Sequence, residues 1–309
     1  MVIPMYQAGA WIGEALTSVD AQTYPVLECI VVDDGSTDDG ADVVRAFART
    51  SACEVRLVFQ KNSGVSAARN AGLALAAGDL IALLDSDDFW HPSKLATQVR
   101  HLEQEGSAAC LTGYSIVDSS TRRIVGAVRF GNPERAIRRC LAIEGSGLAF
   151  SSTLLLTRAA LDEHVGFDPR VSICEDLELA TRLYRSGGLT IVPEFLAAYR
   201  VHPLQSHREL DRMAGNTSVL LTDVVSFEGF RPSLERRCRA NLDIHVGMQM
   251  AASGLFRESG GWLLRGVKRR PLSIISLPFH VVVRRLARRA RTLLGPRTWP
   301  VSASVGSPG

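Results

Sequence analysis

The sequence predicts an α/β fold in which a mixed, mostly parallel sheet is flanked by helices. The first observation is an alternation of apolar, β-branched segments with helical segments between residues 26 and 85. This alternation predicts parallel strands joined by right-handed crossovers, as in a nucleotide-binding half-sheet. The second observation is that two of the apolar runs stop abruptly at acidic residues. Ligands bind at the carboxyl ends of strands in such sheets, so we expect the site there.

The elements of this half follow in order. A strand over 26–32 leads into the acidic turn 33–38, where Gly35 allows a tight turn before the next helix. A strand is expected over 55–59, then a helix over 65–77 that Gly78 closes as a C-terminal cap, then the strand that begins at Leu80. Only Val2 and Ile3 precede Pro4, so the first strand is expected to be unusually brief, which leaves open a natural start upstream of Met1.

The second half is less regular. Strands are expected over 108–117, 124–130 and 150–157, and a helix over 175–186 is indicated by its apolar stripe. Two glycines end that helix, and short strands are expected over 189–193 and 195–201. Beyond about residue 206 the pattern is helical, with a candidate hairpin over 241–267. We therefore predict a catalytic domain over 1–206, a helical extension over 207–264 and a basic amphipathic, partly disordered tail over 265–309.

The charge of the chain is unevenly distributed. The net charge is +3, yet the segment 265–297 holds ten Lys or Arg and no Asp or Glu, so the remainder carries −7. An arginine-rich amphipathic segment is typical of contact with an anionic bilayer, and we expect peripheral membrane contact through 265–297. Nucleic acid is a weaker alternative, because few aromatic residues are interleaved with the basic ones. A solvated helix that packs on the catalytic domain is the structural alternative.

Cysteine usage and hydropathy bear on the compartment. The six cysteines contain no Cys-x-x-Cys pair, which favours reduced thiols over disulfides or a zinc site. No signal peptide opens the sequence, and no apolar run reaches the ~18 residues of a spanning helix. We expect a cytoplasmic protein, working at the inner face of the membrane if the basic tail binds there.

The segment 80–88 is the most informative part of the chain. Five apolar residues, Leu-Ile-Ala-Leu-Leu, are followed by Asp85, Asp87 and Asp88 within four positions. Carboxylates gathered this closely repel one another and need a compensating cation. The Asp-x-Asp spacing of Asp85 and Asp87 suits Mg²⁺ or Mn²⁺, which bind a carboxylate or two together with substrate phosphates. A polar turn that caps the next helix is the alternative for this segment alone.

Other segments become informative when they are taken together with this one. Tyr6 follows the first strand, where a base can stack on its ring. Asp33 and Asp34 end the second strand, and they can accept hydrogen bonds from a base or a ribose. Lys61 and Arg69 lie near the start of the helix expected at residue 65, a setting that favours anions. Two further segments are the pair Glu175-Asp176, at a helix start, and His202, after the last expected strand.

In this order these segments, together with 80–88, resemble family 2 glycosyltransferases, which have the GT-A fold. The resemblance covers residues 2 to 206. It implies an inverting transfer of a sugar from a nucleoside-diphosphate sugar, assisted by a divalent metal. Two departures are Gln7, where the family usually has Asn, and the brief first strand that supports Tyr6.

The resemblance also implies a role for each matched residue. Tyr6 and Asp34 would hold the nucleoside, and Asp33 would support their turn. Asp85 would contact the ribose or the water shell of the metal, Asp87 would bind the metal, and His202 would contact the metal or the diphosphate. Asp176 would be the general base, with Glu175 as the competing candidate. Lys61 and Arg69 are candidates for binding the donor phosphates.

The expected function is transfer of a hexosyl group from a UDP- or dTDP-sugar to a hydroxyl of a saccharide or lipid-linked acceptor. Such a product would belong to a polysaccharide, a glycolipid or the cell envelope. A sugar nucleotidyltransferase is an alternative, disfavoured because the N-terminus lacks a Gly-rich loop bearing Arg and Lys. A non-catalytic protein that binds nucleotide-sugar is the other alternative, disfavoured because both acidic pairs are intact.

Overall fold

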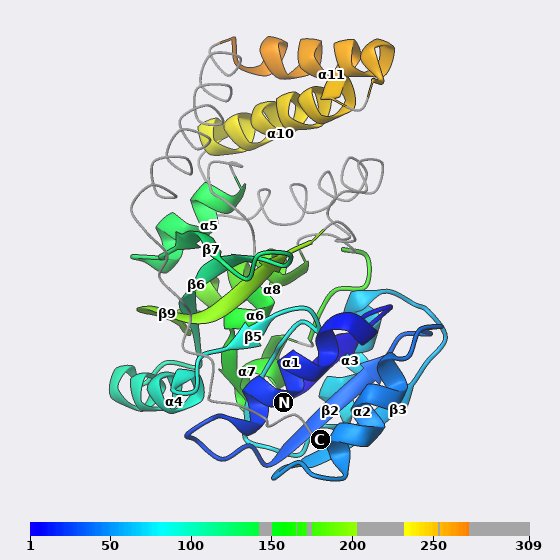
Figure 1. Ribbon diagram of the computed structural model, residues 1–309. Coiled ribbons are helices and arrows are strands. Elements are labelled where there is room, and N and C mark those ends of the chain that lie inside the picture. Colours follow the sequence, from blue (N-terminus) through cyan, green and yellow to red (C-terminus); the bar gives the residue numbers. More distant parts are fainter. Residues whose placement is uncertain (142–149, 165, 172–174, 203–231, 253, 272–309) are drawn as a thin grey trace.

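The computed structural model describes residues 1–141, 150–164, 166–171, 175–202, 232–252 and 254–271. Figure 1 shows an α/β unit in the lower part of the view and two long helices, α10 (Pro232–Ala252) and α11 (Phe256–Arg269), above it. The α/β class predicted from the sequence is confirmed. The predicted boundary at residue 206 and most of the predicted tail lie outside the described residues.

The first half of the chain forms the parallel part of the sheet. Strands β1 (Val2–Met5), β2 (Glu28–Asp33) and β3 (Glu54–Phe59) pair in parallel in the order β1-β2-β3. On the other side of β1, the Leu84 amide donates to the Val2 carbonyl over 3.1 Å, just after β4 (Leu80–Ala82). A parallel bridge between Val2 and Leu83 joins the two strands. The carboxyl ends of β1, β2 and β4 therefore share one edge, as the sequence predicted.

Helices α1 (Gly9–Asp20), α2 (Gly40–Ala48) and α3 (Val65–Leu75) connect these strands. Helix α3 lies very close to β1, because a Cβ on Gly72 would stand 2.4 Å from Cγ1 of Val2. A glycine is needed for this approach. The predicted Gly78 cap is wrong: α3 ends at Leu75, and Ala76 already has an extended backbone.

The second half forms a sheet in the order β4-β8-β6-β9-β5, with β7 paired to β6. Only the β6–β9 pair of these is parallel. The strands are β5 (Phe89–Trp90), β6 (Ala109–Asp118), β7 (Ile124–Val128), β8 (Leu155–Thr157) and β9 (Leu189–Val201).

Two strand predictions in this half are wrong in detail. The segment 150–157 was expected to be one strand, but α6 (Phe150–Thr153) forms its first half and only β8 is extended. The strands expected over 189–193 and 195–201 are the single strand β9, whose register against β6 shifts near Gly113. A Cβ on Gly113 would lie 2.9 Å from the Glu194 carbonyl oxygen, so this close passage needs a glycine.

The remaining helices are α4 (Lys94–Glu105), α5 (Pro133–Leu141), α7 (Arg158–His164) and α8 (Glu175–Arg185). Helices α10 and α11 pack against each other as a hairpin, which confirms the hairpin predicted over 241–267 and starts it earlier. Among the residues described, no helix has both the length and the hydrophobicity needed to cross a bilayer.

A buried lysine under the sheet gives the fold a pH dependence. Lys94 is fully buried, and its ammonium donates to Gln98 Oε1 over 2.7 Å and lies 4.0 Å from the centre of the Trp90 ring. No carboxylate in the described part of the chain forms an ion pair with it. Burial lowers the pKa of Lys94 to about 7, because the charged form loses its hydration.

We predict that the folded wild type loses stability as the pH falls from about 10 to 7, and that Lys94→Met removes this loss. Between about pH 7 and pH 10 the unfolded chain binds a proton on Lys94 that the folded chain does not. The unfolding free energy of the wild type should therefore rise with pH relative to Lys94→Met, by up to about 1.4 kcal/mol per pH unit. Urea denaturation of both proteins at pH 7, 8 and 9 measures this difference. The same change of unfolding free energy with pH in both proteins would contradict it.

Candidate active site

A single buried arginine joins the two acidic segments that the sequence singled out. Arg69, on α3, binds Asp85 Oδ1 through Nη2 at 2.6 Å and Glu175 Oε1 through Nη1 at 2.5 Å. Its side chain is only 3% exposed, and its guanidinium lies 5.0 Å from the centre of the Phe167 ring. The carboxyl end of β4 and the start of α8 are therefore held together, although they are far apart in the sequence.

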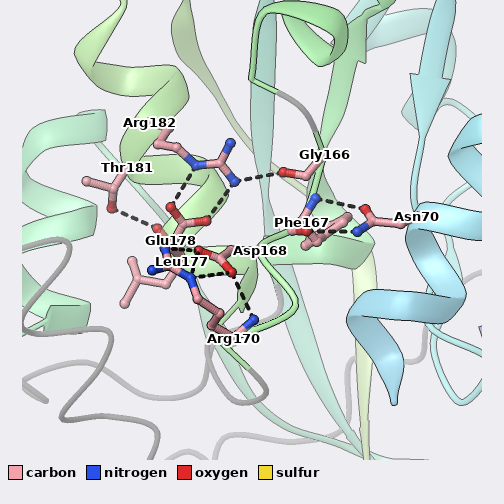
Figure 2. A network of polar contacts seen from close by, with 9 residues as sticks. All are labelled: Asn70, Gly166, Phe167, Asp168, Arg170, Leu177, Glu178, Thr181 and Arg182. Carbon is pink, nitrogen blue, oxygen red and sulfur yellow. Dashed lines mark hydrogen bonds and ion pairs between the residues drawn. The ribbon is translucent and has the colours of Figure 1, made fainter. Parts of the chain in front are cut away.

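The loop that leads into α8 is fixed from both sides, as Figure 2 shows. From α3, the Asn70 amide donates to the Phe167 carbonyl over 2.8 Å and accepts from the Phe167 amide over 2.9 Å. From α8, Arg182 donates to the Gly166 carbonyl over 2.7 Å while it pairs with Glu178. These bonds tie Gly166 and Phe167 to both α3 and α8.

Asp176 lies beside this ion pair but is not held by it. One of its carboxylate oxygens accepts the Leu177 amide over 2.7 Å, whereas Arg69 binds Glu175. Burial, and then the neighbouring carboxylate of Glu175, raise the pKa of Asp176 to about 7. A carboxylate with this pKa takes up and releases a proton near neutral pH. Of the pair, Asp176 therefore has the properties of a general base and Glu175 those of an ion-pair partner.

Asp87 and His202 lie side by side on the other part of the site. Their Oδ2 and Nε2 atoms are 2.9 Å apart, and the side chain of Asp87 is 27% exposed. This is the distance of a hydrogen bond between the two groups, and a carboxylate oxygen and an imidazole nitrogen are both ligand types that divalent ions bind. Within the described ranges, no group of three or more His, Cys, Asp or Glu side chains gathers as a metal cage. An ion held by Asp87 and His202 would therefore need further oxygen ligands, such as those of a diphosphate.

Asp88 is the buried anchor of the acidic segment and not a helix cap. Its Oδ2 accepts the Ser152 hydroxyl over 2.6 Å, and its Oδ1 accepts the Arg200 amide over 2.9 Å. Ser152 Oγ also accepts the Asp85 amide over 3.2 Å. Burial raises the pKa of Asp88 well above its usual range, with the charges of Asp87 and Asp85 adding to the effect. This network fixes the backbone from which Asp85 and Asp87 project.

Sequence reasoning missed three residues that hold Asp87 and His202. Arg200, which is 2% exposed, donates through Nε to the Asp87 carbonyl over 2.7 Å and through Nη2 to Glu14 Oε2 over 2.6 Å. Its guanidinium lies 5.0 Å from the centre of the Trp11 ring, and Trp11 stacks on His202 with 5.1 Å between ring centres. Trp11 and Glu14 on α1 belong to no motif, so no sequence signal marked them.

The ends of β1 and β2 meet at the same edge. Tyr6 is 53% exposed just after β1, so its ring is accessible to a ligand. Gln7, with φ of 51°, accepts the Thr37 amide over 2.9 Å through Oε1 and so binds the turn after β2. Asp33 Oδ1 holds that turn by accepting the Ser36 amide over 2.8 Å. The glutamine therefore makes the link between the two strand ends.

Asp34 is buried and already bound by the protein. Its Oδ1 accepts from Gln60 Nε2 over 2.7 Å and from the Ser63 amide over 2.8 Å, and its Oδ2 accepts the Gly64 amide over 2.8 Å. The carboxylate thus fixes the loop before α3. Its contact with a nucleoside remains a prediction.

The two basic candidates have different surroundings. Lys61 is exposed in the loop between β3 and α3, where a phosphate can reach it. Arg69 lies beneath Asp85, with both terminal nitrogens bound to carboxylates. This placement favours a role in holding the acidic segments, and its contact with donor phosphate stays a prediction. Trp90 is 2% exposed and donates to the Ser152 carbonyl, so it is a packing residue.

The assembled site has an excess of negative charge. Five carboxylates, those of Asp85, Asp87, Asp88, Glu175 and Asp176, stand against the two guanidiniums of Arg69 and Arg200. If all were ionised, this set would carry −3. Burial is the largest cause of the raised pKa of Asp85, Asp88 and Asp176, and neighbouring carboxylates add to it. Such a site attracts a divalent cation.

Comparison with known families decides the relationship of the chain. Residues 1–165, more than half of the chain, match the model of the family described as "Glycosyl transferase family 2". The chain belongs to glycosyl transferase family 2.

Curated relatives agree with this family 2 membership. An uncharacterized glycosyltransferase of Nostoc is 30% identical over 67% of this chain and 66% of its own length. The succinoglycan biosynthesis protein ExoU of Rhizobium meliloti is 31% identical over 68% of this chain and 65% of its own length. This chain covers 66% of the length of the Nostoc relative and 20% of the length of each of two Rickettsia glycosyltransferases.

Solved structures show the same fold. TarS 1–349 of S. aureus in complex with UDP-GlcNAc has a TM-score of 0.61 and 16% identity, over 88% of this chain and 80% of that one. A mannosyltransferase of Pyrobaculum calidifontis in complex with GDP-Man and Mn²⁺ has a TM-score of 0.60 and 21% identity, over 95% of this chain and 79% of that one. The GT-A fold predicted from the sequence is thereby confirmed for this family 2 chain.

We predict different costs for two adjacent serines of α6. Ser152→Ala removes the hydrogen bond to the buried Asp88 carboxylate and should lower the unfolding free energy by about 1–3 kcal/mol. Ser151→Ala is the matched control, because Ser151 Oγ is buried without a hydrogen-bond partner in the described part of the chain. It should cost clearly less than Ser152→Ala, because no hydrogen bond between described residues is lost. Equal losses in urea denaturation would contradict the role given to Ser152.

Proposed function

We propose that this chain is a metal-dependent, inverting glycosyltransferase that moves a sugar from a UDP- or dTDP-sugar to an acceptor hydroxyl. The single observation that carries the proposal is the convergence of Asp85 and Glu175 on Arg69. This convergence sets the Asp87–His202 pair and Asp176 around one acidic site. The family and the nucleotide-sugar complexes of the structural neighbours support the reaction class.

The two halves of the site have separate tasks in this reaction. Asp87 and His202 would hold Mn²⁺ or Mg²⁺, which when bound supplies a Lewis acid for the charge on a leaving diphosphate. Tyr6, Asp33, Asp34 and Lys61 surround the nucleotide end, by stacking, by hydrogen bonds and by charge. These contacts orient the sugar so that one face of its anomeric carbon is open toward Asp176.

Asp176 acts on the acceptor. The acceptor hydroxyl attacks the anomeric carbon from the face opposite the diphosphate, and the Asp176 carboxylate takes the hydroxyl proton. The C–O bond to the diphosphate breaks as the new glycosidic bond forms. Glu175 stays bound to Arg69 and keeps the pKa of Asp176 near the pH at which it works.

The product would enter a polysaccharide, a glycolipid or another part of the cell envelope, as the names of relatives such as ExoU suggest. A saccharide or a lipid-linked saccharide is the matching acceptor. We place the protein in the cytoplasm, at the inner face of the membrane if residues 265–297 bind it.

We predict that Asp176→Asn lowers sugar transfer by about 10²–10⁴-fold, because the general base is lost. Binding of UDP with Mn²⁺ should persist in this variant. Asp87→Asn should instead weaken UDP binding in Mn²⁺ while leaving metal-free binding unchanged. Asp42→Asn, on the exposed face of α2, is the control. Full transfer and donor hydrolysis in both Asp176→Asn and Asp87→Asn would refute the proposal.

The pH profile gives a second prediction. Because the base must be ionised, kcat/KM for donor hydrolysis should rise with pH and level off above about 7. Glu175→Gln removes a like charge beside Asp176, so its profile should shift to lower pH. A profile that shifts upward, or one that falls between pH 6 and 8 in the wild type, would contradict the assignment of the base.

The donor is identified by thermal stabilisation with UDP-, dTDP- and GDP-sugars, with and without Mn²⁺.

A further inference from the structure

Helix α11 turns one face away from the rest of the described chain. The helix lies on the far side of α10 from the α/β unit and packs against α10 (Figure 1). Its inner face is small, because Ser259 and Gly266 are buried there and a Cβ on Gly266 would stand 2.5 Å from Cγ1 of Ile244. A helix turns by about 100° per residue, so this packing fixes the opposite face. The outer face consists of four exposed residues, Arg257, Gly261, Leu264 and Lys268.

Large apolar side chains are exposed on the outer face and at the start of the helix. Leu264 is 55% exposed, Phe256 at the start of α11 is 73% exposed, and Leu255 before it is 44% exposed. Among the described residues, nothing would touch a Cβ built on Gly260 or Gly261, so the surface beside these side chains is flat and open. Apolar groups in water gain free energy when another apolar phase covers them. The surface therefore suits a partner with an apolar interior.

The charges of the outer face are all positive. Arg257 and Lys268 form no ion pair with the described residues. On the flank of the helix, by contrast, Arg269 binds Asp243 of α10. Glu258 is the one carboxylate in the sequence of α11, and it lies on the same flank, eleven residues before Arg269. The outer face thus combines exposed apolar groups with cations whose charge is not compensated.

An anionic bilayer matches both properties. A helix at a bilayer surface buries apolar side chains at the boundary of head groups and acyl chains, while its cations meet lipid phosphates. The sequence continues with the same sign, because 265–297 holds ten Lys or Arg and no Asp or Glu. The rest of the chain carries −7, so an anionic surface repels it and attracts the end that bears α11.

We propose that the outer face of α11 docks on an anionic bilayer. Phe256 and Leu264 enter the boundary below the head groups, and Arg257 and Lys268 meet lipid phosphates. The contact belongs to the folded hairpin and begins ahead of the basic segment 265–297. It does not depend on the transfer reaction. In this orientation α10 lies between the bilayer and the α/β unit (Figure 1).

Sedimentation of the full chain with vesicles tests the apolar part of the face. The vesicles contain phosphatidylglycerol and phosphatidylcholine. Phe256→Ser with Leu264→Ser should lower the partition coefficient by at least about tenfold. The matched control, Leu27→Ser with Phe59→Ser, replaces side chains of the α/β unit that are 70% and 55% exposed, and it should bind like the wild type. Equal partitioning of the two variants, or no binding by the wild type, would overturn the proposal.

The positive part of the face is tested by salt. Arg257→Gln with Lys268→Gln should bind more weakly at low salt than Arg49→Gln with Arg100→Gln, which removes two exposed arginines of the α/β unit. The difference should shrink as the NaCl concentration rises, because salt screens exposed charges. Vesicles of phosphatidylcholine alone should bind the wild type weakly. Equal binding of the two variants at low salt would overturn the choice of an anionic bilayer as the partner.

Tryptophan quenching separates the outer face from the basic segment that follows it. Phe256→Trp adds an indole at the face, and Leu27→Trp adds one on the α/β unit. With brominated acyl chains, Phe256→Trp should gain quenching relative to the wild type and Leu27→Trp should not. If residues 272–309 alone held the protein, both added indoles would stay unquenched on vesicles that sediment the protein, which would overturn the proposal. Melting temperatures should match the wild type in all variants, because the replaced side chains are exposed.

Discussion

The site depends on one buried cation, Arg69. Its guanidinium sits between Asp85, at the carboxyl end of β4, and Glu175, at the start of α8. A buried charge of this kind persists only with partners, and loss of one partner of such a pair typically costs about 3–5 kcal/mol. Arg69 therefore does two things at once: it neutralises carboxylates that would repel each other, and it fixes the distance between two separate segments. The two sides of the site, for which we propose metal binding and proton acceptance, take their relative position from Arg69.

The same constraint produces the chemical difference within the acidic pair. Because Arg69 binds Glu175, Asp176 is left to accept the Leu177 amide and feels the negative charge of Glu175 beside it. Burial and that charge give Asp176 a pKa near 7. A second buried arginine, Arg200, supports Asp87 by donating to the Asp87 backbone carbonyl. Beside it, Trp11 supports His202 by stacking on the imidazole ring. Two buried arginines thus set the geometry of the residues around them.

The sequence allowed the parallel half of the fold to be predicted, because its strands are short apolar runs and each informative acidic residue follows one directly. The segment 150–157 resembles a strand in the sequence because its Phe and Thr residues and its run of leucines suit a buried extended chain. In the fold, Phe150–Thr153 form α6, where Ser152 binds Asp88. The roles of Trp11, Glu14 and Arg200 were not predictable, since the contacts join α1 to β9 across most of the chain. Burial of Arg69 beneath Asp85 was equally invisible, and the pattern around it indicated only a cation near a helix start.

The most direct measurement is a crystal structure of the protein with UDP and Mn²⁺, with the ion located by its anomalous scattering. The account predicts a manganese peak bonded to Asp87, a diphosphate on the same side, and the Asp176 carboxylate facing the end of that diphosphate with Arg69 still between Asp85 and Glu175. A manganese peak away from Asp87, or an Asp176 carboxylate that faces a different cavity from the diphosphate, would contradict it.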